Sequence, residues 1–220
     1  MRKCDTRSNQ RETPENVFKL QRYLEFSRSL EDHTRLVFAD EKPMKELMIF
    51  SKTRRDIYTG YVPKNIVPST AKNRFNILCA VNLKGGNVAP VYYNIIEEST
   101  DSALFIQFVN NLIDNNVLQE GDFFVVDNCT VHNKGDNVGL EDALWDLHCI
   151  QLLLLPPYTP ELNPTELVFC SLLMKLISKN RCYNSIDAYD FVDAIAQKLD
   201  EISDLNEVER FYQKCTYHNF

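Results

Sequence analysis

The chain has 220 residues, 44% of them hydrophobic, and a formal net charge of −7 at neutral pH. This composition supports one large domain or two small ones, and it argues against a nucleic-acid-binding surface that is basic throughout. The sequence contains no apolar run of the roughly 18 residues that a membrane span needs, and its polar N-terminus does not resemble a signal peptide. Its seven scattered cysteines are typical of a reducing compartment.

The first half of the chain predicts one helix and three strands. Residues 1 to about 16 are polar and aperiodic, which is typical of a linker. Apolar residues at three- and four-residue spacing predict a helix from Val17 to about Leu30. Thr34–Glu41 is a predicted strand that ends in two acids, and residues 75–83 and 88–96 predict an antiparallel hairpin.

The second half alternates helices with strands. The predicted helices are Asp101–Asn116, 137–147, Asn163 to about Asn180, and a last one from Ser185. Phe123–Asp127 is a predicted strand that also ends in an acid. Cys149–Leu155 is another, and its continuous apolar run indicates burial on both faces. The chain therefore predicts a mixed five-stranded sheet with helices on its faces.

Three acids follow predicted strands and could meet at one edge of this sheet. Asp40 and Asp127 stand at strand ends, and Glu166 lies in the first turn of the helix that Asn163 and Pro164 begin. Glu166 has an alternative reading, because Asn163 and Glu166 also fit a capping box. Three neighbouring carboxylates repel one another unless a cation neutralises them, and hard oxygen ligands suit Mg²⁺ or Mn²⁺.

The segments around two of these acids resemble the catalytic core of the Tc1/mariner and IS630 transposases. In that family an aspartate–asparagine pair is followed by a histidine five residues beyond the aspartate, as in Asp127, Asn128 and His132. A Pro-Pro-Tyr-Ser/Thr-Pro-x-Leu-Asn-Pro-x-Glu block then follows, as in residues 156–166. The resemblance implies a ribonuclease H-like α/β fold with a triad of two aspartates and a glutamate.

Carried over by position, the resemblance implies that Asp40, Asp127 and Glu166 are catalytic and hold Mg²⁺ or Mn²⁺, as a pair of ions. Glu41 is the alternative to Asp40. The resemblance places Asn128, His132 and Asn163 beside the triad. It also predicts a linker and leading helix over residues 1–33 and the catalytic domain over 34–220, without the helix-turn-helix domains of full-length members.

A basic stretch separates the first strand from the hairpin. Residues 42–74 carry eight basic and two acidic side chains, a local net charge of +6. The candidate phosphate contacts are Lys42, Lys45, Arg54, Arg55 and Lys64. The other reading of this stretch is an ordinary solvated loop.

The leading functional hypothesis is metal-dependent cleavage and joining of DNA strands, with transposon ends and target DNA as partners and a homodimer as the active form. The second is a truncated or host-adopted relic that binds DNA or protein without catalysis, and the third is a ribonuclease H-like nuclease of other purpose. The expected site of action is the nucleus in a eukaryote, or the cytoplasm and nucleoid in a bacterium.

Overall fold

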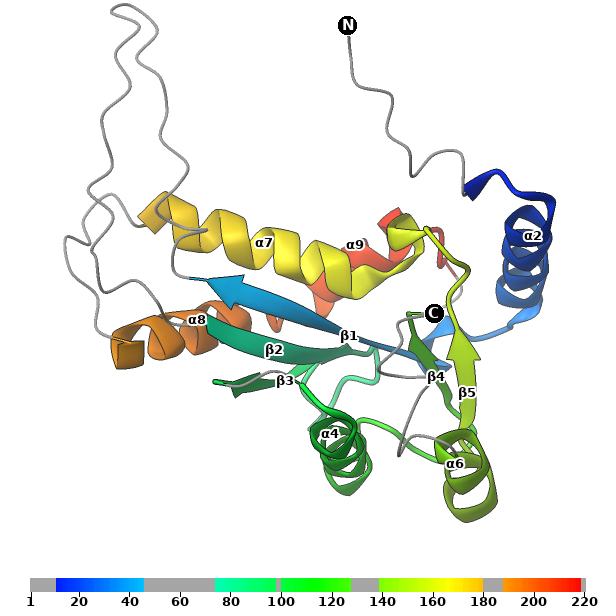
Figure 1. Cartoon of the computed structure of the whole chain (residues 1–220), viewed down its shortest axis with the longest axis horizontal. Coiled ribbons are helices and arrows are strands. Elements are labelled where there is room, and N and C mark those ends of the chain that lie inside the picture. The colour runs from blue at the N-terminus through cyan, green and yellow to red at the C-terminus, as the bar shows by residue number, and fades with distance from the viewer. Residues whose placement is uncertain (1–10, 46–73, 98–99, 128–138, 180–187, 219–220) are drawn as a thin grey trace, which may run out of the picture.

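A five-stranded mixed sheet forms the centre of the protein, as a computed structural model shows (Figure 1). The structure describes residues 11–45, 74–97, 100–127, 139–179 and 188–218. The strands are β1 Leu36–Lys45, β2 Arg74–Val81, β3 Val91–Ile96, β4 Phe123–Val126 and β5 Gln151–Leu154. Their order across the sheet is β3-β2-β1-β4-β5, with β1, β2 and β3 antiparallel and with β4 and β5 parallel to β1.

Helices cover both faces of the sheet, as predicted. They are α2 Pro14–Ser29, α4 Ser102–Asp114, α6 Leu140–His148, α7 Pro164–Lys179, α8 Ala188–Ile202 and α9 Leu205–Lys214, with short 3-10 turns at His33–Arg35 and Pro160–Leu162. Figure 1 shows α4 and α6 on one face and α7 and α9 on the other. Each face has its own core, because side chains alternate along a strand: Phe38 packs on the α7 side, and Val37 and Ala39 pack on the α4 side.

The register between β1 and β4 decides where the first two acids lie. The two strands pair in parallel from Leu36 with Phe123 to Ala39 with Val126. Asp40 and Asp127 are the next residues on the two strands. The sheet itself therefore sets these two aspartates side by side, at the point where β4 ends.

The prediction that the first strand ends at its two acids was wrong. β1 continues to Lys45, paired with β2 as far as Arg74. On its other side the pairing with β4 stops at Ala39. Asp40 therefore lies in a part of β1 that pairs with β2 but not with β4. The unpaired side leaves room beside the aspartate for a cavity.

The prediction that the leucine-rich strand is buried on both faces was also wrong. Leu152 and Leu153 of β5 are partly buried, and Leu154 is 43% exposed. The reason is the strand order, because β5 is an edge strand and its outer side is not covered by another strand of this sheet. Leu155, just after the strand, is buried.

Helix α9 lies in a part of the chain where the sequence pattern predicted no helix. Asp204 caps this helix by accepting a hydrogen bond from the Glu207 N–H at 3.1 Å, and Val208, Phe211 and Tyr212 are buried. The Tyr212 hydroxyl donates to the carbonyl oxygens of Leu36, at 2.7 Å, and Val81, at 2.9 Å. This one side chain therefore joins the beginning of β1 to the end of β2.

Replacing Tyr212 with phenylalanine is expected to lower the free energy of unfolding by about 1–3 kcal/mol, because two buried carbonyl oxygens lose a hydrogen-bond donor. Urea unfolding followed by circular dichroism measures the change. Tyr93→Phe is the control, since its hydroxyl bonds to Asp200 and Ala196 near the surface. An equal loss in both variants would contradict the special role of Tyr212.

The described parts of the chain contain no helix that is long and apolar enough to cross a membrane. Four cysteines fall within these parts, Cys79, Cys149, Cys170 and Cys215, and all four are free thiols.

Candidate active site

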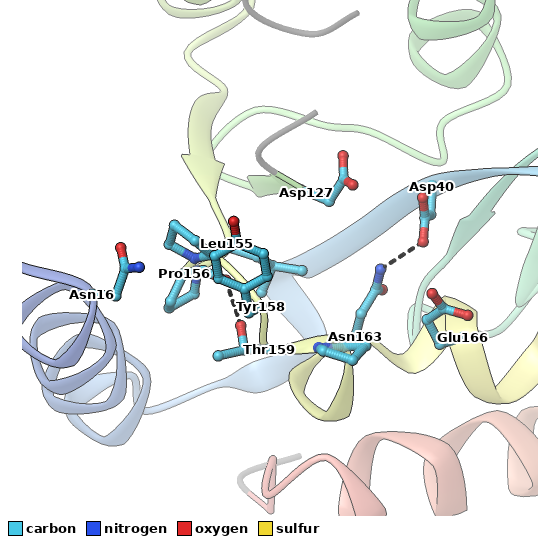
Figure 2. A pocket seen from close by; sticks show the side chains of 11 residues that line it. Asn16, Asp40, Asp127, Leu155, Pro156, Tyr158, Thr159, Asn163 and Glu166 are labelled. Atoms are coloured by element: carbon cyan, nitrogen blue, oxygen red, sulfur yellow. Dashed lines mark hydrogen bonds between the residues drawn. The ribbon is translucent and has the colours of Figure 1, made fainter. Parts of the chain in front are cut away.

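A cavity of about 530 Å³ opens beside Asp40 within β1, where β4 and β5 end and α7 begins. The three acids that the sequence predicts, Asp40, Asp127 and Glu166, all line it (Figure 2). The rest of its wall comes from Asn16, Leu155, Pro156, Pro157, Tyr158, Thr159, Pro160 and Asn163. The proline-rich turn therefore forms one side of the cavity, and the carboxylates lie on the other.

Asp40 is partly buried and accepts hydrogen bonds on both of its carboxylate oxygens. Its Oδ1 accepts from the Glu41 N–H at 2.8 Å, and its Oδ2 accepts from Asn163 Nδ2 at 3.0 Å (Figure 2) and lies 3.4 Å from the Thr165 hydroxyl oxygen. Burial, followed by the negative charges of Asp127 and Glu166, raises the pKa of Asp40 to about 7. The three acids are thus close enough to act on one another electrostatically.

Glu41, the alternative to Asp40, points to the opposite face of the sheet. Side chains alternate along β1, so Asp40 shares its face with Phe38 and Lys42, and Glu41 shares its face with Ala39. Glu41 does not line the cavity, and its buried Oε2 has no hydrogen-bond partner within the described structure. Of the two neighbouring acids, Asp40 is therefore the one placed beside Asp127 and Glu166.

Asn163 begins α7, but it does not form a capping box with Glu166. Its Oδ1 accepts from the Thr165 N–H at 3.2 Å and from the Thr165 hydroxyl at 2.6 Å, which is an N-cap arrangement. A capping box would need the Asn163 N–H for the Glu166 carboxylate, and this N–H donates instead to the Pro160 carbonyl at 3.1 Å. The Glu166 carboxylate is therefore turned into the cavity.

Lys42 forms an ion pair with Glu166. Its Nζ lies 3.2 Å from Glu166 Oε2 and 5.7 Å from the centroid of the Phe169 ring. From the sequence Lys42 is a candidate phosphate contact, because no local pattern pairs it with Glu166, which lies 124 positions away. In the structure this ammonium group is a counter-ion within the acidic site.

The three carboxylates line one side of the cavity without converging on a common point. No three His, Cys, Asp or Glu side chains among the described residues lie close enough together to hold a metal ion. The reason is visible in their partners: Asp40 is drawn to Asn163, and Glu166 is drawn to Lys42. The carboxylates of Asp40 and Glu166 therefore have polar partners within the protein.

Several predicted residues cannot be compared with the structure. Asn128, His132, Arg54, Arg55 and Lys64 lie outside the described residues, and so does the side chain of Lys45 at the end of β1. Their suggested roles therefore remain predictions. Asn163, which the resemblance placed beside the triad, donates directly to Asp40.

The raised pKa of Asp40 predicts a falling stability between about pH 4 and pH 7 in metal-free buffer. The pKa of this carboxyl rises from 3.8 to about 7, so in that range the folded protein holds a proton that the unfolded chain releases. Proton release on unfolding makes stability fall as pH rises, and above pH 7 the effect is complete. Asp40→Asn, which cannot ionise, should therefore be more stable than the natural protein at pH 8 by about 2–4 kcal/mol.

Thermal unfolding at pH 4, 6 and 8 in the presence of a chelator measures this effect. Asp146→Asn, at an exposed position of α6, is the matched control and should leave the pH dependence unchanged. A natural protein that becomes steadily more stable from pH 4 to pH 8 would contradict the assignment of a raised pKa to Asp40.

The strand order, the helices on both faces and the acids at the ends of β4 and within β1 define a ribonuclease H-like fold with an acidic site. The chain belongs to the DDE superfamily endonuclease family, whose sequence profile matches residues 35–190. This match confirms the resemblance drawn from the motifs around Asp127 and Glu166. No curated protein sequence matches the chain significantly.

Solved structures of the Mos1 mariner transposase share this fold. The catalytic domain of Mos1 transposase matches with a TM-score of 0.61 and 15% identity, over 94% of this chain and 87% of that one. The Mos1 strand transfer complex matches with a TM-score of 0.65 and 18% identity, and the Mos1 paired-end complex with Mn matches with 0.62 and 19%. Each of these two matches covers 91% of this chain and 56% of the Mos1 chain, so the present sequence spans a little over half of that length.

Proposed function

We propose that this chain is the catalytic domain of a DNA transposase of the Tc1/mariner–IS630 type, which cleaves DNA strands and joins them to a target. The observation that carries the proposal is the register of β1 and β4, which sets Asp40 beside Asp127 at a cavity that Glu166 also lines. Membership of the DDE superfamily endonuclease family supports it. The activity requires acids on rigid elements and uses no protein nucleophile.

The residues of the cavity fit a divalent cation of the hard type. All three acids are carboxylates, the ligand class that Mg²⁺ and Mn²⁺ prefer, and the raised pKa of Asp40 reflects negative charge that a cation would neutralise. Mos1 structures were solved with Mn and with Mg. We propose that Asp40, Asp127 and Glu166 hold the metal, as two ions, which would activate water and stabilise the leaving oxygen.

The other residues of the site have supporting roles in this proposal. Asn163 orients Asp40 through its side-chain amide, and Lys42 offsets the charge of Glu166. Asn128 follows Asp127 in the chain and His132 is five residues beyond it, and in this proposal both side chains lie next to the acids. Pro157 and Tyr158 form the facing wall of the cavity.

DNA is the proposed partner, both as transposon ends and as target. The Mos1 structures include a paired-end complex and a strand transfer complex. For this chain we propose that Lys42, Lys45, Arg54, Arg55 and Lys64 supply phosphate contacts and that the active form is a homodimer. It would act in the nucleus of a eukaryote or on the nucleoid of a bacterium.

Calorimetric titration with Mn²⁺ tests the assignment of the site. The natural protein is expected to bind the ion, and Asp127→Asn is expected to bind it at least about tenfold more weakly, because one anionic ligand is lost. Asp146→Asn serves again as a charge-matched control that should bind normally. Equal binding by the natural protein and Asp127→Asn would remove Asp127 from the metal site.

The competing proposal is that the chain is a transposase relic, which binds DNA or protein without catalysis. One observation favours it, namely that no three described acids converge on one point. Metal binding alone does not separate the two functions, but nicking of a DNA substrate with pre-exposed transposon ends does. Nicking that depends on Mg²⁺ supports the transposase, and DNA binding without nicking supports the relic.

A further inference from the structure

A second cavity lies between α2 and the exposed edge strand β5. Its volume is about 620 Å³, within the roughly 300–1,000 Å³ of typical ligand sites. We call it the α2–β5 groove, and its lining is Phe18, Lys19, Arg22, Tyr23, Phe26, Leu153, Leu154, Leu155, Pro156 and Pro157. Neither the sheet nor the acidic site explains why this groove is there.

The groove adjoins the candidate active site. Leu155, Pro156 and Pro157 line both cavities, so the proline turn that follows β5 is their common wall. Figure 2 shows Asn16 of α2 facing this turn from the side opposite the acids. A flexible polymer whose backbone is held at Asp40 and Asp127 could therefore continue over the turn and into the groove.

The charges of the two cavities are opposite. Three carboxylates line the acidic site, and among the described residues the charged side chains that line the groove are the cations Lys19 and Arg22. Lys19 also pairs with Glu15 at 2.6 Å, but both side chains are about half exposed or more, and such pairs contribute little to stability. The groove therefore offers positive charge to an anion that extends away from the acids.

Exposed aromatic rings lie along the same path. Phe18 is 58% exposed on α2, with the Arg22 guanidinium 5.9 Å from its ring centroid. Tyr158, which lines the adjoining acidic site and not the groove, is 45% exposed on the proline turn. Exposed aromatic rings beside a cationic groove are the features that bind single-stranded nucleic acids, where bases stack on rings and phosphates meet lysine or arginine. A protein segment could bind to the apolar lining, but its binding would not require aromatic rings and cations arranged next to an acidic site.

We propose that the α2–β5 groove binds single-stranded DNA next to the phosphodiester that the acidic site receives, with its phosphates near Lys19 and Arg22 and its bases against Phe18 and Tyr158. The proposal rests on the proposed function, because it takes DNA as the substrate of that site. It adds a binding site on α2, outside the acids and outside the basic residues 42–74.

A binding assay in a chelator tests the groove without requiring catalysis. The probes are a fluorescein-labelled blunt duplex and the same duplex with a single-stranded overhang of about six thymidines, within the usual site size of single-strand binders. The natural chain should bind the overhang probe more tightly. Phe18→Ala with Arg22→Ala should weaken overhang binding roughly tenfold and leave blunt-duplex binding almost unchanged.

The matched control is Val17→Ala with Arg28→Ala, which removes one apolar and one cationic side chain from exposed positions of the same helix that do not line the groove. It should bind both probes as the natural chain does, and the thermal unfolding of all variants should be similar. Photo-cross-linking of an overhang that carries 5-iodouracil gives an independent readout, and its expected target is Phe18 or Tyr158.

Two outcomes would overturn the groove proposal: overhang binding that the groove variant retains in full, or cross-links that fall only elsewhere in the chain. The first outcome would leave the groove to a protein partner. Failure of the proposed function looks different, since the natural chain would then not nick DNA in Mg²⁺ whatever its overhang binding. Overhang preference that depends on Phe18 and Arg22 would still support the groove in that case.

Discussion

Replacing Glu166 by glutamine is expected to reduce Mg²⁺-dependent nicking of DNA about a thousandfold. The change keeps the size of the side chain and removes one anionic oxygen from the proposed metal site, and a loss of ~4 kcal/mol in transition-state stabilisation corresponds to that factor. A capping role would predict no such loss, since glutamine also serves in a capping box, and in the structure the Asn163 N–H is already bound to Pro160.

The stability of Glu166→Gln separates a catalytic loss from a folding defect. The ion pair with Lys42 disappears, but both side chains are about a third exposed, so its contribution to stability is small. Repulsion between Glu166 and Asp40 also disappears, and the melting temperature without metal should be equal or higher.

The assay is nicking of a substrate with pre-exposed transposon ends, over a range of Mg²⁺ concentrations. Glu161→Gln is the matched control, because Glu161 lies five positions earlier, pairs with Arg11 at the surface and does not line the cavity. Nicking by Glu166→Gln at nearly the natural rate would exclude Glu166 from catalysis, and the assignment of the whole Asn-Pro-Thr-Glu segment would then fail.

The largest expected effect on stability comes from Phe38→Ala, at about 3–5 kcal/mol. Phe38 is fully buried on β1, with its ring centroid 5.3 Å from that of Tyr212 and 5.1 Å from that of Tyr217. Removing the ring leaves a cavity between β1 and the C-terminal segment. Such a loss is a large part of the roughly 5–15 kcal/mol that stabilises a typical domain.

Denaturant unfolding of Phe38→Ala and Phe38→Leu measures this effect. Leucine keeps most of the apolar volume, so its cost should be much smaller, at about 1.5 kcal/mol or less. Mn²⁺ should also raise the melting temperature of Phe38→Leu, since the site two residues away would remain formed. A similar small loss in both variants would mean that the C-terminal segment does not depend on packing against Phe38.

The elements that the sequence predicted well are those with a clear period or a clear boundary. The amphipathic pattern after Asp101 predicted a helix, and the structure has α4 over Ser102–Asp114 with Asp101 as its N-cap. The short apolar run before Asp127 predicted a strand, and β4 ends at Val126. These local signals predicted the order of the strands and helices as far as α8, and the resemblance to the transposase family implied the ribonuclease H-like fold.

What the sequence could not predict depends on neighbours in space. The leucines of β5 have the same composition whether the strand is central or at an edge, so their exposure follows only from the strand order. The length of β1 depends on its pairing with β2, which continues after β4 has ended. Local patterns therefore predicted the strands, but not the burial of β5 or the pairing of β1.

The candidate site shows the same division. Asp40, Asp127 and Glu166 could be selected from motifs, because each follows a predicted strand or begins a helix. The contacts of Lys42 with Glu166 and of Asn163 with Asp40 join residues more than 120 positions apart. Such contacts require the folded chain, and they explain why the acids in this structure face their own donors and not one common point.

The central position of β1 also has a consequence for the order in which a newly made chain can fold. β1, β2 and β3 follow one another along the chain and pair in antiparallel fashion, so we expect them to assemble before β4 has been made. The acidic site needs Asp40 from that early sheet, Asp127 after β4 and Glu166 from α7. A ribosome-bound chain would thus form three of its five strands before the acidic site is complete, and the proposed cleavage of DNA could begin only after residue 166 has emerged.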